Sequence, residues 1–151
     1  MNKKRVNEWI LPAREAIIRC KITEDGKSVI KTFRGQISSF GAAVVMGSLK
    51  SAVAFFTEQG GASVSREKLI VAMYYIINGK AYEIPEKTDE QIKAKEVFEW
   101  VCKSKDPDMK EKFIDASIAL KLALNFFDLK EEKTKKNDKK EETQNAGKGE
   151  A

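Results

Sequence analysis

The stretch Phe33–Phe56, FRGQISSFGAAVVMGSLKSAVAFF, decides the fold of this chain. Beyond Gly41 its only charged residue is Lys50, so most sides of this segment should be covered by protein. A helix that is apolar nearly all round belongs at the centre of a bundle or in a membrane. At roughly 16 residues the segment is shorter than the roughly 20 apolar residues of a membrane span. We therefore expect it to be the central helix of a soluble helical domain.

Serine and glycine residues interrupt the apolar pattern of this stretch. The run Ser38–Gly41 predicts an interruption or bend, with Ser39 capping the next helix. That next helix should begin near Ala42 and end at Phe56, before Gly60 and Gly61. The inward face of this helix would carry many small side chains, glycine and alanine, so that neighbouring helices could approach closely.

The rest of the chain also carries helical patterns. Apolar residues recur at three- and four-residue steps, and no alternation typical of a strand continues beyond four residues. The expected helix starts are Asn2 or Asn7 (or Leu11, because Pro12 starts or kinks that helix), Ser28, Ser63 or Ser65, Thr88, and Asp106. Two connections are also expected, a turn around Gly26 and an extended segment from Ala81 to Pro85. The pattern predicts an all-α protein, a compact bundle of five to six helices.

Composition divides the chain into two parts. The 22 residues from Lys130 to Ala151 contain no aromatic or branched apolar residue. Such a segment cannot bury enough apolar surface to offset the entropy lost on folding. We therefore expect a single helical domain over 1–129 and a disordered charged tail over 130–151.

The net charge of +5 is unevenly placed. The segment 1–68 has 12 basic and 6 acidic residues, a net +6, while the remainder is close to neutral. A basic half suits a polyanionic partner. An unevenly charged but merely soluble surface is the competing interpretation.

The basic residues of this half show one alignment. Lys27, Lys31 and Arg34 stand at steps of four and three, so on a helix starting near Ser28 they would share one face. Arg14 and Lys21 lie seven positions apart on one flank of the first helix. We take the first three as the main basic strip for a polyanionic partner, with Arg14, Lys21 and Lys50 as outer candidates, and the resemblance described below implies that this partner is RNA. A solvated helix face is the alternative.

The chain has few of the residue types and motifs on which catalytic sites depend. The chain has no histidine, so acid–base work would fall to Asp, Glu, Lys or Tyr. Acidic pairs such as Asp106 and Asp108 stand at expected helix starts, where the helix dipole accounts for them. Cys20 and Cys102 are too far apart for a metal motif, which predicts two buried thiols in a reducing compartment. We expect no enzyme, no cofactor, no metal, no signal peptide and a cytoplasmic location.

Aromatic residues offer a second kind of candidate. Trp100 falls off the apolar stripe of its expected helix, and tryptophan is enriched at protein interfaces, so Trp100 is the candidate protein-contact residue. Tyr74, Tyr75 and Tyr82 could stack on bases. Core packing with the hydroxyl at the rim is the more frequent role of such tyrosines.

Three segments resemble a known family. Phe33-Arg34-Gly35-Gln36-Ile37-Ser38-Ser39-Phe40-Gly41, Leu49-Lys50-Ser51-Ala52-Val53-Ala54-Phe55-Phe56 and Ala119-Leu120-Lys121-Leu122-Ala123-Leu124-Asn125-Phe126-Phe127 resemble the small helical subunit of the type III-B CRISPR RAMP (Cmr) effector complex. That family has an isoleucine, a glycine break, a leucine-rich helix ending in an aromatic, and a closing alanine/leucine helix. The resemblance covers Val6 to Leu129.

The resemblance implies a non-catalytic role in antiviral defence. The small subunit stacks with copies of itself along the filament and helps to hold guide and target RNA, while other subunits cut. Its RNA contacts would be sequence-independent phosphate contacts. Only Arg34 and Lys50 lie near the family pattern, and the other basic candidates rest on helical alignment. The alternative function is a helical adaptor that docks partner proteins through Trp100 and contacts no nucleic acid.

Overall fold

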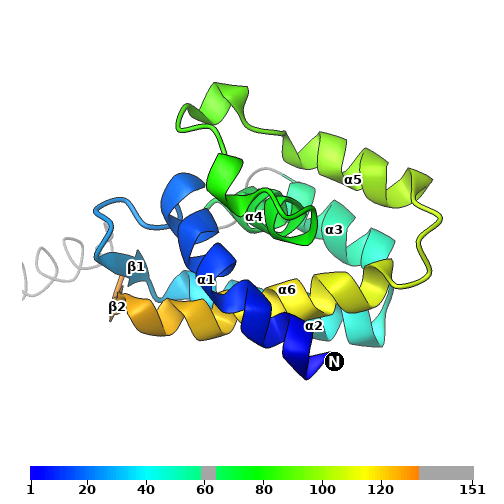
Figure 1. Cartoon of the computed structure of the whole chain (residues 1–151), viewed down its shortest axis with the longest axis horizontal. Helices are drawn as coiled ribbons and strands as arrows, with labels where there is room; N and C mark the ends of the chain where they lie inside the picture. Colours follow the sequence, from blue (N-terminus) through cyan, green and yellow to red (C-terminus); the bar gives the residue numbers. More distant parts are fainter. Residues whose placement is uncertain (59–63, 133–151) are drawn as a thin grey trace, which may run out of the picture.

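The structure is a computed structural model that describes residues 1–58 and 64–132. Its helices are α1 (Lys3–Arg19), α2 (Thr32–Met46), α3 (Leu49–Thr57), α4 (Glu67–Ile77), α5 (Ala94–Lys103) and α6 (Met109–Ala123). Shorter elements are the strands β1 (Ser28–Ile30) and β2 (Asp128–Lys130) and the 3-10 turns η1 (Ala81–Glu83), η2 (Thr88–Glu90) and η3 (Leu124–Phe126). The predicted all-α fold is confirmed, with one small sheet added (Figure 1).

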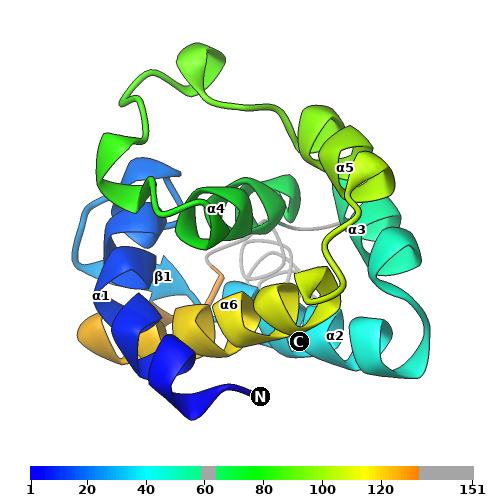
Figure 2. The ribbon, with the colours of Figure 1, turned by 45° about the vertical axis from the view of Figure 1, so that its right-hand side comes forward.

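Helix α6 lies at the centre of the bundle. It packs against α1, α2 and α4, while α3 and α5 lie across α4 from α1 (Figures 1 and 2). Helices α1 and α6 run in the same direction, since Arg5 contacts Asp115 near one end and Arg14 contacts Phe126 at the other. Helix α2 approaches α6 closely at Gly41, where an added Cβ would lie 3.8 Å from the Ser117 hydroxyl.

Three phenylalanines join the helices of the core. The ring of Phe40 packs edge-on against Phe56, with centroids 5.3 Å apart, and lies 6.1 Å from Phe113. All three side chains are fully buried. Because these rings come from α2, α3 and α6, the stretch Phe33–Phe56 contributes two of the three, but the central helix is α6 and not the expected one in this stretch.

The expected break in this stretch is misplaced. Helix α2 runs without interruption through Gly41 and ends at Met46. Helix α3 begins after Ser48, whose hydroxyl accepts a hydrogen bond from the Ser51 N–H at 3.1 Å. The stretch therefore forms two helices divided at Gly47 rather than at Gly41. A continuous α2 is favoured because it buries both Phe40 and Val44.

The two helices are also less covered than expected. Val45, Met46 and Phe55 are exposed, and Met46 retains 87% of its accessible surface. Apolar side chains here face outward because α2 and α3 each contact the bundle along one side only. The expectation of cover on most sides is wrong for the part of the stretch around the α2–α3 connection.

A strand replaces the expected helix start at Ser28. The Asp25 carboxylate accepts hydrogen bonds from the N–H groups of Lys27 and Ser28, and Gly26 takes the positive φ of +76° expected for this turn. The chain then leaves in an extended conformation, and β1 pairs in parallel with β2, Val29 opposite Leu129. A helix beginning near Ser28 is therefore wrong, because pairing with the distant β2 satisfies this backbone.

The folded part extends beyond the predicted boundary at Leu129. The Lys130 carbonyl accepts a hydrogen bond from the Lys31 N–H at 2.8 Å, which makes Lys130 the last residue of β2. The rest of the predicted tail, from residue 133 onward, lies outside the described residues.

The structure shows where α1 and α4 begin, which the sequence left open between alternatives. Helix α1 begins after Asn2, whose side chain accepts the Arg5 N–H, and it continues through Pro12. Helix α4 begins at Glu67 without a side-chain cap from Arg66. Of the two serines expected to cap α4, Ser65 makes no side-chain cap bond, and Ser63 lies outside the described residues.

The connection between α4 and α5 also differs from expectation. Residues from Ala81 to Glu83 form a 3-10 turn rather than an extended segment, and Thr88 opens a second 3-10 turn instead of α5. Helix α5 begins at Ala94 because Gln91 is drawn into the interior, where its amide donates to the carbonyls of Arg19 and Pro85.

Candidate nucleic-acid interface

The predicted strip of three cations does not form on one helix. Lys27 precedes β1, Lys31 stands at the start of α2, and Arg34 lies in the first turn of α2. A helical alignment needs all three in one helix, and β1 intervenes between Lys27 and Lys31. The strip is therefore wrong as a helix face, although all three side chains are exposed.

Arg14 and Phe126 meet at the end of α6. The guanidinium carbon of Arg14 lies 4.9 Å from the centroid of the Phe126 ring. This contact follows from the parallel packing of α1 on α6, which brings the second half of α1 to η3. Phe126 remains 51% exposed, while its neighbour Phe127 is buried.

Arg34 lies on the other side of the same helix end. Together with Lys121 it flanks a small cleft of about 160 Å³. The remaining lining residues are Ile118, Leu122, Leu124, Asn125 and Leu129, so the lining contains two cations and no acid. Leu122 of this lining is exposed and lies one turn before Phe126, the residue that Arg14 contacts.

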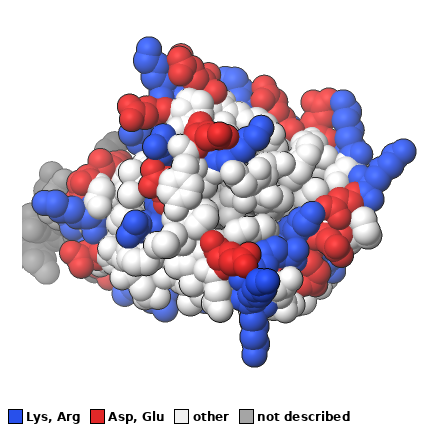
Figure 3. All heavy atoms as spheres, in the orientation of Figure 1, with Lys and Arg blue, Asp and Glu red and all other residues white. Residues whose placement is uncertain are grey.

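We call this region the α6-end surface, defined by Arg14, Arg34, Lys121, Leu122 and Phe126. On the face shown in Figure 3, the area over the later part of α6 is largely uncharged, with basic side chains along its lower edge. Aromatic and aliphatic side chains beside cations are the components that bind the bases and phosphates of RNA.

Like most Lys and Arg side chains in the described part of the chain, the cations of this surface form no ion pair. Arg5, Arg19 and Lys112 each bind a carboxylate within 2.7 Å. By contrast, Arg14, Arg34 and Lys121 form no ion pair within residues 1–58 and 64–132. No carboxylate among these residues therefore neutralises their charge.

The other predicted cations lie elsewhere. Lys50 is in the first turn of α3, at the opposite end of the molecule from the β1–β2 pair (Figures 1 and 2). Lys31 lies 3.8 Å from the Glu131 carboxylate. Lys21, at a left-handed φ of +60°, accepts a hydrogen bond at its carbonyl from the Lys68 ammonium. The structure thus brings Arg14 and Arg34 to one helix end and leaves Lys50 apart.

Lys21 lines a larger cleft of about 510 Å³. The charged residues of its lining are Lys21, Lys68, Lys130, Glu24, Asp25, Glu131 and Glu132. Four acids against three lysines give no excess of positive charge. This cleft is therefore a poorer match for RNA than the α6-end surface.

The aromatic candidates are largely occupied by packing. Trp100 is half buried and packs edge-on against Tyr74, with centroids 5.0 Å apart. The Tyr75 hydroxyl accepts a hydrogen bond from the Ile92 N–H, so this tyrosine has the predicted core role. Tyr82, in contrast, is 57% exposed. The role of Trp100 as a protein contact stays a prediction.

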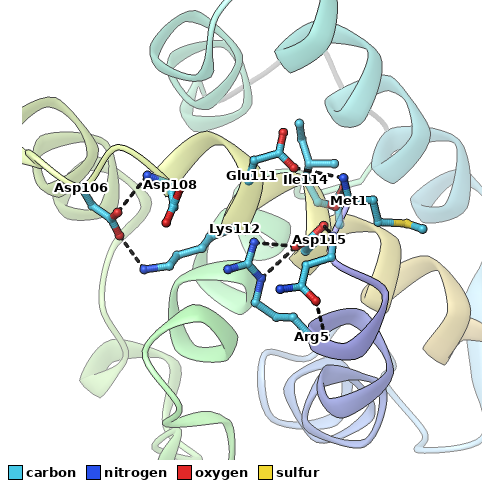
Figure 4. A network of polar contacts seen from close by, with 10 residues as sticks. Met1, Arg5, Asp106, Asp108, Glu111, Lys112, Ile114 and Asp115 are labelled. Atoms are coloured by element: carbon cyan, nitrogen blue, oxygen red, sulfur yellow. Dashed lines mark hydrogen bonds and ion pairs between the residues drawn. The ribbon is translucent and has the colours of Figure 1, made fainter.

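A buried ion pair joins the start of α1 to the middle of α6 (Figure 4). The Asp115 side chain is fully buried and accepts a 2.8 Å hydrogen bond from the Arg5 Nε. Nearby, the Lys112 ammonium binds the Asp106 carboxylate, which also accepts the Asp108 N–H, and these contacts lower the pKa of Asp106. Asp106 thus binds the backbone at the start of α6, as expected, and Asp115 binds residues at the start of α1.

The two cysteines have different environments. Cys20 is buried, and burial raises the pKa of its thiol to about 12. Cys102 is exposed on α5, contrary to the expectation of two buried thiols, because only the Ala94, Val97 and Val101 side of that helix is buried. In the described part of the chain, no three His, Cys, Asp or Glu side chains gather in a way that could bind a metal.

None of the helices that the structure describes is both long and apolar enough to span a membrane. Comparison of the chain with models of protein families, with curated proteins and with solved structures gives no match. The functional argument therefore depends on the residues and the surface themselves.

Proposed function

We propose that this protein is a non-catalytic RNA-binding subunit, in the manner of the small subunit of a type III-B CRISPR (Cmr) effector complex. Its part would be to hold guide and target RNA in the cytoplasm through phosphate contacts, alongside copies of itself and other Cmr subunits that cut the target. The family part of the proposal rests on the sequence resemblance of the α2, α3 and α6 segments.

The observation that carries the RNA-binding part is the composition of the α6-end surface, where three cations without an ion pair in residues 1–58 and 64–132 accompany the exposed Phe126 ring. Arg14, Arg34 and Lys121 come from three packed helices, α1, α2 and α6, so the packing of these helices sets the relative positions of their backbones. Each cation that contacts a phosphate releases counterions from the RNA, which favours binding and makes it sensitive to salt. Such contacts position a strand without reading its sequence.

A charge-removal variant tests this surface. Arg14→Gln, Arg34→Gln and Lys121→Gln together keep side-chain length and remove three charges. Because the salt slope for single strands is about 0.7 per contact, the plot of log affinity against log salt should flatten by about 2. The measurement is fluorescence anisotropy of a labelled single-stranded RNA titrated with the purified protein at several salt concentrations.

A second variant with the same change of charge is the matched control. Lys87→Gln, Lys93→Gln and Lys95→Gln alter three exposed lysines around η2 and α5, across α4 from α6 (Figure 2). This control should bind RNA with nearly the wild-type salt slope. If both variants lose the same slope, the binding follows net charge and the α6-end surface has no special part in it.

A second candidate function is a helical adaptor that contacts proteins and no nucleic acid. The exposed Val45, Met46 and Phe55 around the α2–α3 connection favour it, because exposed apolar groups often mark protein contacts. Affinity purification of the tagged protein separates the two functions. Guide-sized RNA and RAMP-type proteins are expected on the first proposal. Recovery of partner proteins without RNA, unaffected by nuclease, would support the adaptor.

A further inference from the structure

Phe126 is exposed and has one cation, Arg14, against its ring. The ring lies in η3 at the end of α6, with the Arg14 guanidinium 4.9 Å from its centroid. One turn earlier in the chain, Leu122 lines the cleft that Arg34 and Lys121 also line. An exposed aromatic ring with one cation against it, followed along the same helix end by a cleft with two more, suits a ligand that has both flat apolar groups and repeated negative charges.

We propose that Phe126 is a stacking platform for an unpaired RNA base, so that the protein selects single-stranded over duplex RNA. This inference rests on the proposed RNA-binding function and adds the class of RNA. A strand crossing the end of α6 would place a base on Phe126, with phosphates near Arg14 on one side and Arg34 or Lys121 on the other.

Arg14 does not prevent this stacking. Its side chain is exposed, and a cation over a ring at an exposed site is a weak contact. A base stacked on an aromatic side chain is generally the stronger interaction. When a base arrives, the Arg14 guanidinium can leave the ring for a phosphate or can stack on the other face of the base, as arginine does in RNA complexes.

Selection for a single strand follows from the geometry of duplex RNA. In an A-form helix each base is already stacked on its neighbours, so its face cannot reach a protein ring. A duplex can still offer phosphates to Arg14, Arg34 and Lys121. Duplex RNA should therefore bind through charge alone, and only a single strand should gain from Phe126.

An acidic amphipathic helix of a protein partner is the competing occupant of this surface. RNA is favoured because Arg14 lies against the exposed Phe126 ring, because the cleft beside Arg34 and Lys121 has no acid in its lining, and because that cleft is small, about 160 Å³. A docked helix would need a continuous groove for several side chains. The experiment below separates the two occupants.

The test compares a labelled oligouridylate with an RNA duplex of equal length, both titrated with the full chain at one salt concentration. Phe126→Leu should weaken binding of the oligouridylate about tenfold, which is about 1.4 kcal/mol, and leave duplex binding and the salt slope unchanged. Phe126→Tyr keeps a ring and should retain the wild-type affinity. Tyr82→Leu, at another exposed aromatic residue in η1, is the control and should change neither affinity.

Each outcome decides a different point. Equal affinity of wild type and Phe126→Leu for the oligouridylate overturns the stacking platform, while a salt slope that still depends on Arg14, Arg34 and Lys121 leaves the proposed function standing. If the wild type binds neither RNA, both proposals fail. If Phe126→Leu loses a co-purifying protein but not RNA, the surface is a protein contact and the platform is overturned. Circular dichroism of each variant verifies that the helices are intact.

Discussion

Arg5 and Asp115 form one ion pair, but replacing Arg5 should lower the stability of the fold more than replacing Asp115. The Asp115 side chain has no exposed surface, whereas that of Arg5 keeps 21% of its surface in contact with water. The Arg5 guanidinium lies within 2.6 Å of the Asp115 carboxylate, and the Asn2 N–H lies 3.3 Å from it (Figure 4). Loss of the arginine would therefore strand a buried charge, and loss of the carboxylate would not.

The magnitudes follow from this asymmetry. Arg5→Met leaves the buried carboxylate without its cation, and breaking a buried pair in this way costs about 3–5 kcal/mol of unfolding free energy. Asp115→Asn keeps a polar group of the same shape, and the guanidinium can turn to water. We expect that change to cost about 1–3 kcal/mol, the cost of a poorly satisfied buried polar group.

Urea unfolding followed by far-UV circular dichroism measures both changes. The double variant Arg5→Met with Asp115→Leu should be more stable than Arg5→Met alone, because no unpaired charge remains buried. Two results would refute the reasoning: Asp115→Asn costing as much as Arg5→Met, or a double variant whose loss equals the sum of the single losses.

Three further predictions concern local contacts. Ser48→Ala removes the cap of α3 and should cost about 0.5–2 kcal/mol of unfolding free energy, measured by urea unfolding. The N–H groups of Lys27 and its neighbour hold the pKa of Asp25 well below its usual range, so the folded state gains stability above about pH 4 and loses it as the pH falls further. Asp25→Asn should remove that part of the acid dependence of the melting temperature. A thiol reagent should label Cys102 rapidly in the folded protein and Cys20 only after denaturation, as counted by mass spectrometry.

Helix type was predictable from the sequence because apolar periodicity is a local property. The stripes of α1, α4 and α6 recur over three or more turns, so each helix could be recognised without knowledge of its neighbours. Boundaries were less accurate where two signals competed. Gly41 and Gly47 both interrupt the apolar run, and only the packing of Gly41 against Ser117 shows that the first glycine serves a helix contact.

The β1–β2 pair could not be found from local pattern. Three residues are too few to show an alternating period, and the partner of Val29 is Leu129. The sequence predicts a helix start at this segment because Val29, Ile30 and Phe33 also fit helical spacing. Long-range pairing overrode that spacing, which is why the Lys27, Lys31 and Arg34 alignment failed with it.

The candidate site was only partly accessible from sequence. Arg14 and Arg34 were identified as cations, but Phe126 and Lys121 were not connected to them, because that requires α1 and α2 to be placed on either side of α6. One local signal was present. Leu122 and Phe126 are four residues apart and fall outside the inward stripe of α6, so two apolar residues were left to share an outward face.

The β1–β2 pair also has a consequence for the order of folding. Ser28 and Asp128 are partners separated by 100 positions, and closing so long a loop costs about 4 kcal/mol in chain entropy. Three paired residues cannot offset that by themselves, so the strands can join only when the helices between them have already brought their ends together. The N–H groups of Lys31 and Asp128, which are bonded across the pair, would then be among the last to gain protection from hydrogen exchange. Their protection would mark the moment at which the two ends of the helical body are fastened to each other.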